Sequence, residues 1–215
     1  MSFLSEDGVR NVVALLERSV THELRHHAML CLTSLVHCST PELGTAAWEA
    51  GAIDVIATAL QQWPEDTSLL GLALCAAVHV MIGPVPSMVE AAVECMDRHL
   101  GDVRLCQAGL RVMRHHAIHA PLPQLPRVAT TLTSVMCKYR SDDTIQYYGA
   151  HTWIAILAME PHELARDHGT LARFAIHECV IKVAAGTTHH SVLVNGQPWH
   201  AFVLSHLFPK LRSAA

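Results

Sequence analysis

The sequence has few aromatic residues, few charged residues and no basic stretch. Phe, Trp and Tyr make up 5% of its 215 residues, and charged residues make up 16%. The low aromatic content disfavours a β-sandwich or barrel, whose strands are rich in aromatic and β-branched residues. The formal net charge of -4, together with the lack of a basic stripe, argues against a nucleic-acid partner.

The chain also lacks the motifs of common nucleotide-binding and hydrolytic sites. It contains no glycine-rich phosphate loop and no Gly-x-Ser-x-Gly elbow. Its seven cysteines include no C-x-x-C pair, and most fall at apolar positions of helical patterns. They predict buried, reduced thiols and an intracellular, cytoplasmic location. The acidic first residues, Met1 to Asp7, do not predict a secretory signal.

Hydrophobic residues, by contrast, reach 51%, with Ala, Leu and Val dominant, and this composition favours a helical core. The stretch from Ser68 to Val89 holds no Asp, Glu, Lys or Arg and is long enough to span a bilayer. It is interrupted by His79, two glycines and two prolines, and the repeat described next places it in a buried helix. We therefore expect no membrane span.

Two segments that lie 43 residues apart share one pattern. Glu6 to Leu16 and Glu49 to Ala59 both read as an acidic residue, any residue, a glycine and then an amphipathic helix. Each is followed by a polar turn, after which a more apolar second helix begins. A pattern that recurs at this spacing predicts an array of helical hairpins.

The second helices carry core positions at a spacing of four, four and three residues, which is one face of an α-helix. The four sets are Leu24, Ala28, Leu32 and Leu35; Leu69, Ala73, Ala77 and Val80; Leu105, Gly109, Met113 and His116; and Ile145, Gly149, Trp153 and Ile156. Leu171, Ala175, Cys179 and Lys182 form a weaker fifth copy. The Ala or Gly at the second position predicts a close approach between neighbouring helices.

These repeats predict one helical domain over residues 1–215. Its approximate repeats are 5–40, 41–84, 85–121 and 122–160, followed by a degenerate repeat and cap at 161–215. Prolines between the repeats mark helix boundaries, because proline is excluded from helix interiors. Near the end, the alternating run before Asn195-Gly196 predicts a loop and turn, and a last helix is expected from about Gln197 to Leu211.

The second repeat resembles an armadillo repeat. The resemblance rests on Glu49-Ala50-Gly51-Ala52-Ile53, followed by an amphipathic helix, an Asp-containing turn and an Ala-rich helix. Ile145-Gln146-Tyr147-Tyr148-Gly149 resembles the start of that repeat's last helix. The family implies an all-α, right-handed α-α superhelix, here of about four to five repeats. HEAT-type arrays share this pattern and stay an open alternative.

In armadillo arrays the last helix of each repeat lines a groove that binds another protein. The resemblance implies a non-enzymatic scaffold or adaptor whose groove residues are Ser34, His79, Arg111, Arg114, His115, Tyr148 and His151. This column lacks the Trp and Asn ladder of members that bind nuclear localisation signals. Its arginines and histidines favour an acidic or phosphorylated segment as the partner.

An enzymatic alternative comes from His22-Glu23-Leu24-Arg25-His26, which matches the H-E-x-x-H of zinc peptidases. The continuation lacks the third ligand of the extended motif, and Leu24 is already a predicted core position. We expect the polar start of a helix here, with no metal or other cofactor, and a zinc-dependent hydrolase is the alternative. His115 with His119, and His189 with His190, are weaker metal-binding candidates.

A third interpretation is a structural subunit of an oligomer or larger complex. The mean hydropathy of +0.26 favours it, because apolar surface left exposed on a helical array is covered by a partner.

Overall fold

A computed structural model describes residues 5–19, 21–37, 41–80, 83, 85–116 and 124–158, together with 193–194 and 197–198. The described residues form an all-helical fold with one short hairpin. The helices are α1 (Glu6–Arg18), α2 (His22–His37), α3 (Pro41–Glu49), α4 (Ala52–Gln62), α5 (Thr67–Val80), α6 (Pro86–Arg98), α7 (Val103–His116), α8 (Leu125–Lys138) and α9 (Asp143–Ala158). The strands are β1 (Leu193–Val194) and β2 (Gln197–Pro198).

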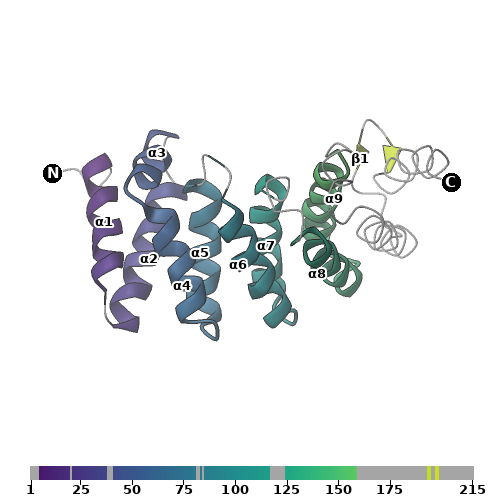
Figure 1. Cartoon of the computed structure of the whole chain (residues 1–215), viewed down its shortest axis with the longest axis horizontal. Helices are drawn as coiled ribbons and strands as arrows, with labels where there is room; N and C mark the ends of the chain where they lie inside the picture. Colours follow the sequence, from purple (N-terminus) through teal and green to yellow (C-terminus); the bar gives the residue numbers. More distant parts are fainter. Residues whose placement is uncertain are drawn as a thin grey trace.

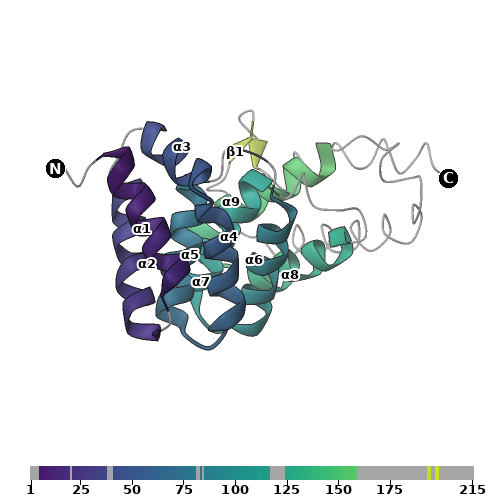
Figure 2. The same cartoon turned by 60° about the vertical axis from the view of Figure 1, so that its left-hand side comes forward.

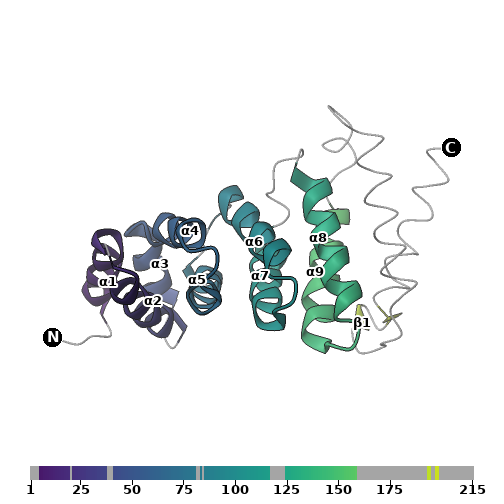
Figure 3. The same cartoon turned by 90° about the horizontal axis from the view of Figure 1, so that it is seen from below.

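The helices form two rows. The first-helix row is α1, α4, α6 and α8, and the second-helix row is α2, α5, α7 and α9. Each helix contacts its neighbours in its own row, and the pairs α1–α2, α4–α5, α6–α7 and α8–α9 join the rows. Figures 1 and 3 show the helices following one another in chain order along the long axis of the molecule. Helix α3 packs against α1, α2, α4 and α5 and lies at the upper edge of this array in Figure 2.

A side-chain cap fixes the start of every helix in the second-helix row. The Thr21 hydroxyl accepts from the Leu24 N–H at 3.3 Å, and the carboxylates of Asp66, Asp102 and Asp142 accept from the N–H groups of Leu69, Leu105 and Ile145. Each cap satisfies a backbone donor that has no partner within its helix. The caps therefore stand at the repeat spacing predicted from the sequence.

Glycine allows one turn and two close helix contacts of this architecture. Gly51 joins α3 to α4 with a φ of 81°, a left-handed conformation in which a side chain would be strained. Gly109 and Gly149 lie where second-row helices meet the row beside them. A Cβ at these positions would come within 2.6 Å of Met96 and 2.5 Å of Met136, respectively. The expected close approach is confirmed at both sites.

Where the structure describes their burial, the predicted core positions are buried, with one exception. Leu69, Ala73, Gly149 and Trp153 have their expected burial, but the Leu24 side chain is 42% exposed. Leu69 is covered because α2 packs beside α5, whereas no described helix lies on the corresponding side of α2.

Arg25 is buried in place of Leu24. Its guanidinium lies 4.0 Å above the Trp63 ring and donates to the Ser19 carbonyl oxygen at 2.6 Å and to the Gln62 side chain. Burial lowers the pKa of Arg25. An arginine of the H-E-x-x-H segment thus anchors α2 to α4.

The expectation for the last part of the chain is wrong at one point. Leu193 pairs with Pro198 and Val194 with Gln197 in an antiparallel hairpin, so a helix does not begin at Gln197. The Asn-Gly pair between the strands is suited to a two-residue hairpin turn, which brings its flanking residues opposite each other. The degenerate repeat starting at Leu171 and the rest of the proposed cap lie outside the described residues.

The long uncharged stretch does not form one helix. Helix α5 ends at Val80 and α6 begins at Pro86. Within the described parts of the chain, no helix has the length and apolar character needed to cross a membrane.

Candidate functional site

The exposed side of the second-helix row carries the residues expected to bind a partner. At its N-terminal end, His37 on α2 and His79 on α5 lie with Nδ1 and Nε2 3.0 Å apart and their ring centroids 4.9 Å apart. One imidazole N–H donates to the bare nitrogen of the other ring, so at least one of the two rings is neutral while the bond exists. The pair links two neighbouring hairpins.

The next residues along the row are Arg111 and His115 on α7. Burial lowers the pKa of His79, and the charges of His37 and Arg111 lower it further. Burial also lowers the pKa of His115, with Arg114 and Arg111 adding to the effect. Arg111 of α7 is thus among the charges that act on His79 of α5.

Aromatic rings and an arginine meet between α7 and α9. The Arg114 Cζ atom lies 5.5 Å from the Tyr147 ring centroid and 5.7 Å from that of Tyr148. The Tyr147 and His151 rings are 4.5 Å apart, and burial followed by the Arg114 charge lowers the pKa of His151. We call Arg111, Arg114, His115, Tyr147, Tyr148 and His151 the α7–α9 cluster.

The arginines of the α7–α9 cluster differ in their partners from those of the first-helix row. Among the described residues, neither Arg111 nor Arg114 forms an ion pair with a carboxylate. The Asp142 carboxylate instead caps α9 and accepts from the Gln107 side chain at 2.9 Å. The cluster therefore combines two permanent positive charges with histidines and phenol groups.

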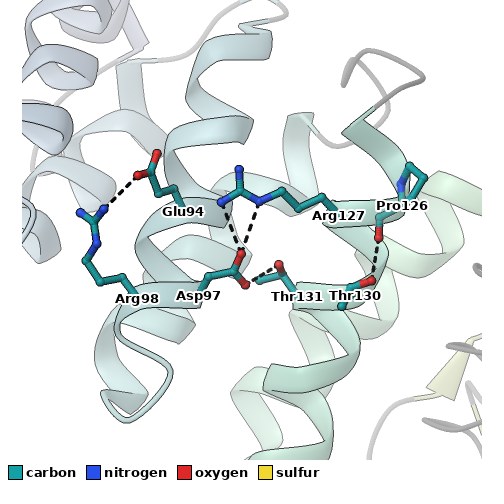
Figure 4. Close-up of polar contacts among 7 residues, drawn as sticks. All are labelled: Glu94, Asp97, Arg98, Pro126, Arg127, Thr130 and Thr131. Atoms are coloured by element: carbon teal, nitrogen blue, oxygen red, sulfur yellow. Dashed lines mark hydrogen bonds and ion pairs between the residues drawn. The ribbon is translucent and has the colours of Figure 1, made fainter.

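In α6 and α8 of the first-helix row, Arg98 and Arg127 lie in ion pairs, as Figure 4 shows. Arg98 lies 3.0 Å from Glu94 in the same helix, and the Arg127 Nε atom on α8 lies 3.4 Å from Asp97 on α6. Thr131 also donates to Asp97 at 2.6 Å. The Arg127 and Thr131 contacts with Asp97 connect α8 to α6.

The H-E-x-x-H segment contacts the next hairpin. His22 lies against the Asp66 carboxylate, and His26 Nε2 is 2.9 Å from the Ser68 hydroxyl. Burial raises the pKa of Asp66, but the Leu69 N–H and His22 outweigh this effect and lower it overall. Across the residues that are described, no group of three or more His, Cys, Asp or Glu side chains could hold a metal ion.

The thiols that the structure describes are free, and two of them are deeply placed. Burial raises the pKa of Cys95 to about 12 and that of Cys106 to about 11. Thiols with raised pKa values stay protonated near neutral pH and are weak nucleophiles. Cys95 and Cys106 are thus core residues of α6 and α7.

The groove residues predicted from the armadillo resemblance omit His37 and Tyr147, which the structure brings into this face. Ser34, which it includes, is exposed and donates to the Leu30 carbonyl oxygen at 2.8 Å in its own helix. The sequence feature that could have identified His37 is its separation of 42 residues from His79, which is close to the repeat length. His119, His189 and His190 lie outside the described residues.

Comparison of the chain with protein-family models, with curated proteins and with solved structures finds no match.

Proposed function

We propose that this chain is an α-solenoid of the armadillo type, and that it works as a non-enzymatic scaffold whose second-helix row binds an acidic segment of another protein. Two features support the solenoid: helix contacts run along each row in chain order, and the second-row helices start with caps at the repeat spacing. A HEAT-type array of the same helices would present the same face.

The observation that carries the binding role is a pair of arginines on one face, Arg111 and Arg114, that have no carboxylate partner within the part of the chain the structure describes. Arg111 and Arg114 lie on the exposed side of α7, flanked by the histidine pair on one side and the tyrosines on the other. An acidic segment would supply the negative charge that the described face lacks, and electrostatic complementarity of this kind selects partners and speeds association. The chain's overall negative charge favours such a local site over general binding to polyanions.

Peptide display with the full chain tests this function. Two random libraries, one rich in Asp and Glu and one rich in Lys and Arg, are selected against the protein under the same conditions. We expect enrichment from the acidic library only, because the basic library would be repelled by Arg111 and Arg114.

A matched pair of double variants then locates the site. Arg111→Glu with Arg114→Glu should weaken the enriched peptides by about 100-fold, which corresponds to roughly 3 kcal/mol. Arg98→Glu with Arg127→Glu changes the net charge equally, but in the first-helix row, and should leave affinity within about twofold. Enrichment of basic peptides, or equal losses in both double variants, would refute the proposal; circular dichroism verifies that each variant is folded.

A further inference from the structure

The α7–α9 cluster has more positive charge than one carboxylate can neutralise. Arg111 and Arg114 are permanently charged, and His115 and His151 add charge when protonated. Tyr147 is 40% exposed, and Arg114 lies near both tyrosine rings, so the phenol groups border the same surface. Positive charge and hydrogen-bond donors therefore converge on a short stretch of two adjacent helices.

The chemistry of these donors distinguishes a phosphate from a carboxylate. A phosphorylated side chain carries a charge of about -1.5 to -2 and three acceptor oxygens, whereas a carboxylate carries one charge and two oxygens. A guanidinium pairs with two phosphate oxygens at once and is held in place by nearby aromatic rings. Two guanidiniums fit one dianion better than they fit one monoanion.

We propose, on the basis of the proposed function, that the α7–α9 cluster binds the phosphate of a phosphorylated serine or threonine in the partner segment. Arg114 and Arg111 bind the phosphate oxygens, and His151 and His115 take up protons as it arrives. The segment continues along α5 toward His79 and His37, because these side chains extend the same row beyond the cluster.

The histidines link this binding to pH. Burial and the positive charges of the α7 arginines lower the pKa values of His151 and His115. A bound dianion would oppose the effect of the arginine charges on these pKa values. Binding then takes up protons, and affinity rises as pH falls from about 8 toward 7. Below about pH 6 the phosphate itself gains a proton, and affinity should stop rising.

The test uses three bead-bound peptide libraries with random residues around a fixed centre, which is phosphoserine, glutamate or serine. We expect the full chain to bind the phosphoserine beads about tenfold more than the glutamate beads, the gain of one added charge-assisted hydrogen bond. Equal binding to phosphoserine and glutamate, with less to serine, would refute the phosphate site but leave the acidic-segment function standing. Equal binding to all three would refute both.

Variants and competitors give the assignment a second readout. Arg114→Gln should reduce phosphoserine binding to the level of glutamate, and Arg114→Lys should restore only part of it, because lysine lacks the two-pronged donor geometry. Arg127→Gln, on the other row, is the control and should change nothing. The proposal fails if Arg127→Gln has the same effect as Arg114→Gln, or if inorganic phosphate or a single-stranded RNA binds more tightly than the phosphopeptides.

Discussion

The two helix rows use the same residue type in opposite ways. In the first-helix row, Arg98 and Arg127 lie against carboxylates of α6, and the Arg127 pair joins α8 to α6. In the second-helix row, Arg114 lies beside two tyrosine rings, and its positive charge disfavours protonation of His115. Arg98 and Arg127 are matched by carboxylates, whereas among the described residues Arg111 and Arg114 are not.

This difference indicates which face is available to a partner. A surface ion pair that is already formed must be broken before its arginine can bind another anion, whereas Arg111 and Arg114 have no such pair to break among the described residues. Residue counts alone do not reveal the contrast, since both rows contain arginine. It depends on which helices lie side by side.

The largest expected effect tests the packing that holds the rows in place. A Cβ at Gly44 of α3 would lie 2.7 Å from the His79 carbonyl oxygen, a backbone atom that cannot move alone, whereas a Cβ at Gly71 would meet only Leu105 Cδ2 at 3.7 Å. We expect Gly44→Ala to lower the free energy of unfolding by about 1–3 kcal/mol. Gly71→Ala, the matched control, should raise it by about 0.5–1 kcal/mol through better helix propensity.

Urea denaturation measures both variants. If Gly44→Ala proved as stable as Gly71→Ala, the close contact between α3 and the His79 backbone of α5 would be wrong.

The next effect concerns the histidines of the second-helix row. Because the pKa values of His79, His115 and His151 are lowered in the folded state, the unfolded chain takes up protons first as pH falls through the ordinary value near 6.5. The free energy of unfolding should therefore decrease between about pH 7.5 and pH 5.5, within the window where these groups titrate. Urea midpoints at a series of pH values measure this slope.

Replacing these three histidines with asparagine should flatten that slope, since their effects act in the same direction. His27→Asn is the control, because His27 is exposed on α2 and, among the described residues, contacts its own helix alone, through the Glu23 carbonyl oxygen and the His26 ring. A slope that stays unchanged in the triple variant would assign the pH dependence to other groups.

The smallest effect compares single arginines between the rows. Arg127→Gln should cost about 0.2–1 kcal/mol of stability, and less at high salt, because Asp97 loses its ion pair but keeps the Thr131 hydrogen bond. Arg114→Gln should be closer to neutral, since the lost contact with the tyrosines is offset by relieved repulsion near His115 and His151. Thermal unfolding at low and high salt compares them, and a larger loss for Arg114→Gln would reverse the contrast between the rows.

Local signals in the sequence were enough to predict much of the fold. The prolines at helix starts and the four-four-three spacing act within one helix, so they can be recognised without knowledge of neighbours. The same spacing predicted the core placement of Trp153, which is fully buried. It failed at Leu24, where burial depends on whether another helix lies alongside.

The candidate site was predictable only in part, for the same reason. Helical periodicity places Arg111 and His115 on one face, but the pairing of His37 with His79 depends on how far α5 is shifted along α2. Tyr147 entered the cluster because α7 packs against α9 and brings Arg114 over its ring.

By itself, the sequence determined the helices, their order and their apolar faces, since helix caps, proline and periodicity are properties of neighbouring residues in the chain. Only the tertiary structure decided which charges are neutralised. Arg127 and Arg114 look alike in the sequence, yet one lies against Asp97 and the other beside Tyr147 and Tyr148. Electrostatic partners are chosen through space, and residues some 30 apart in the chain become neighbours only when the helices pack.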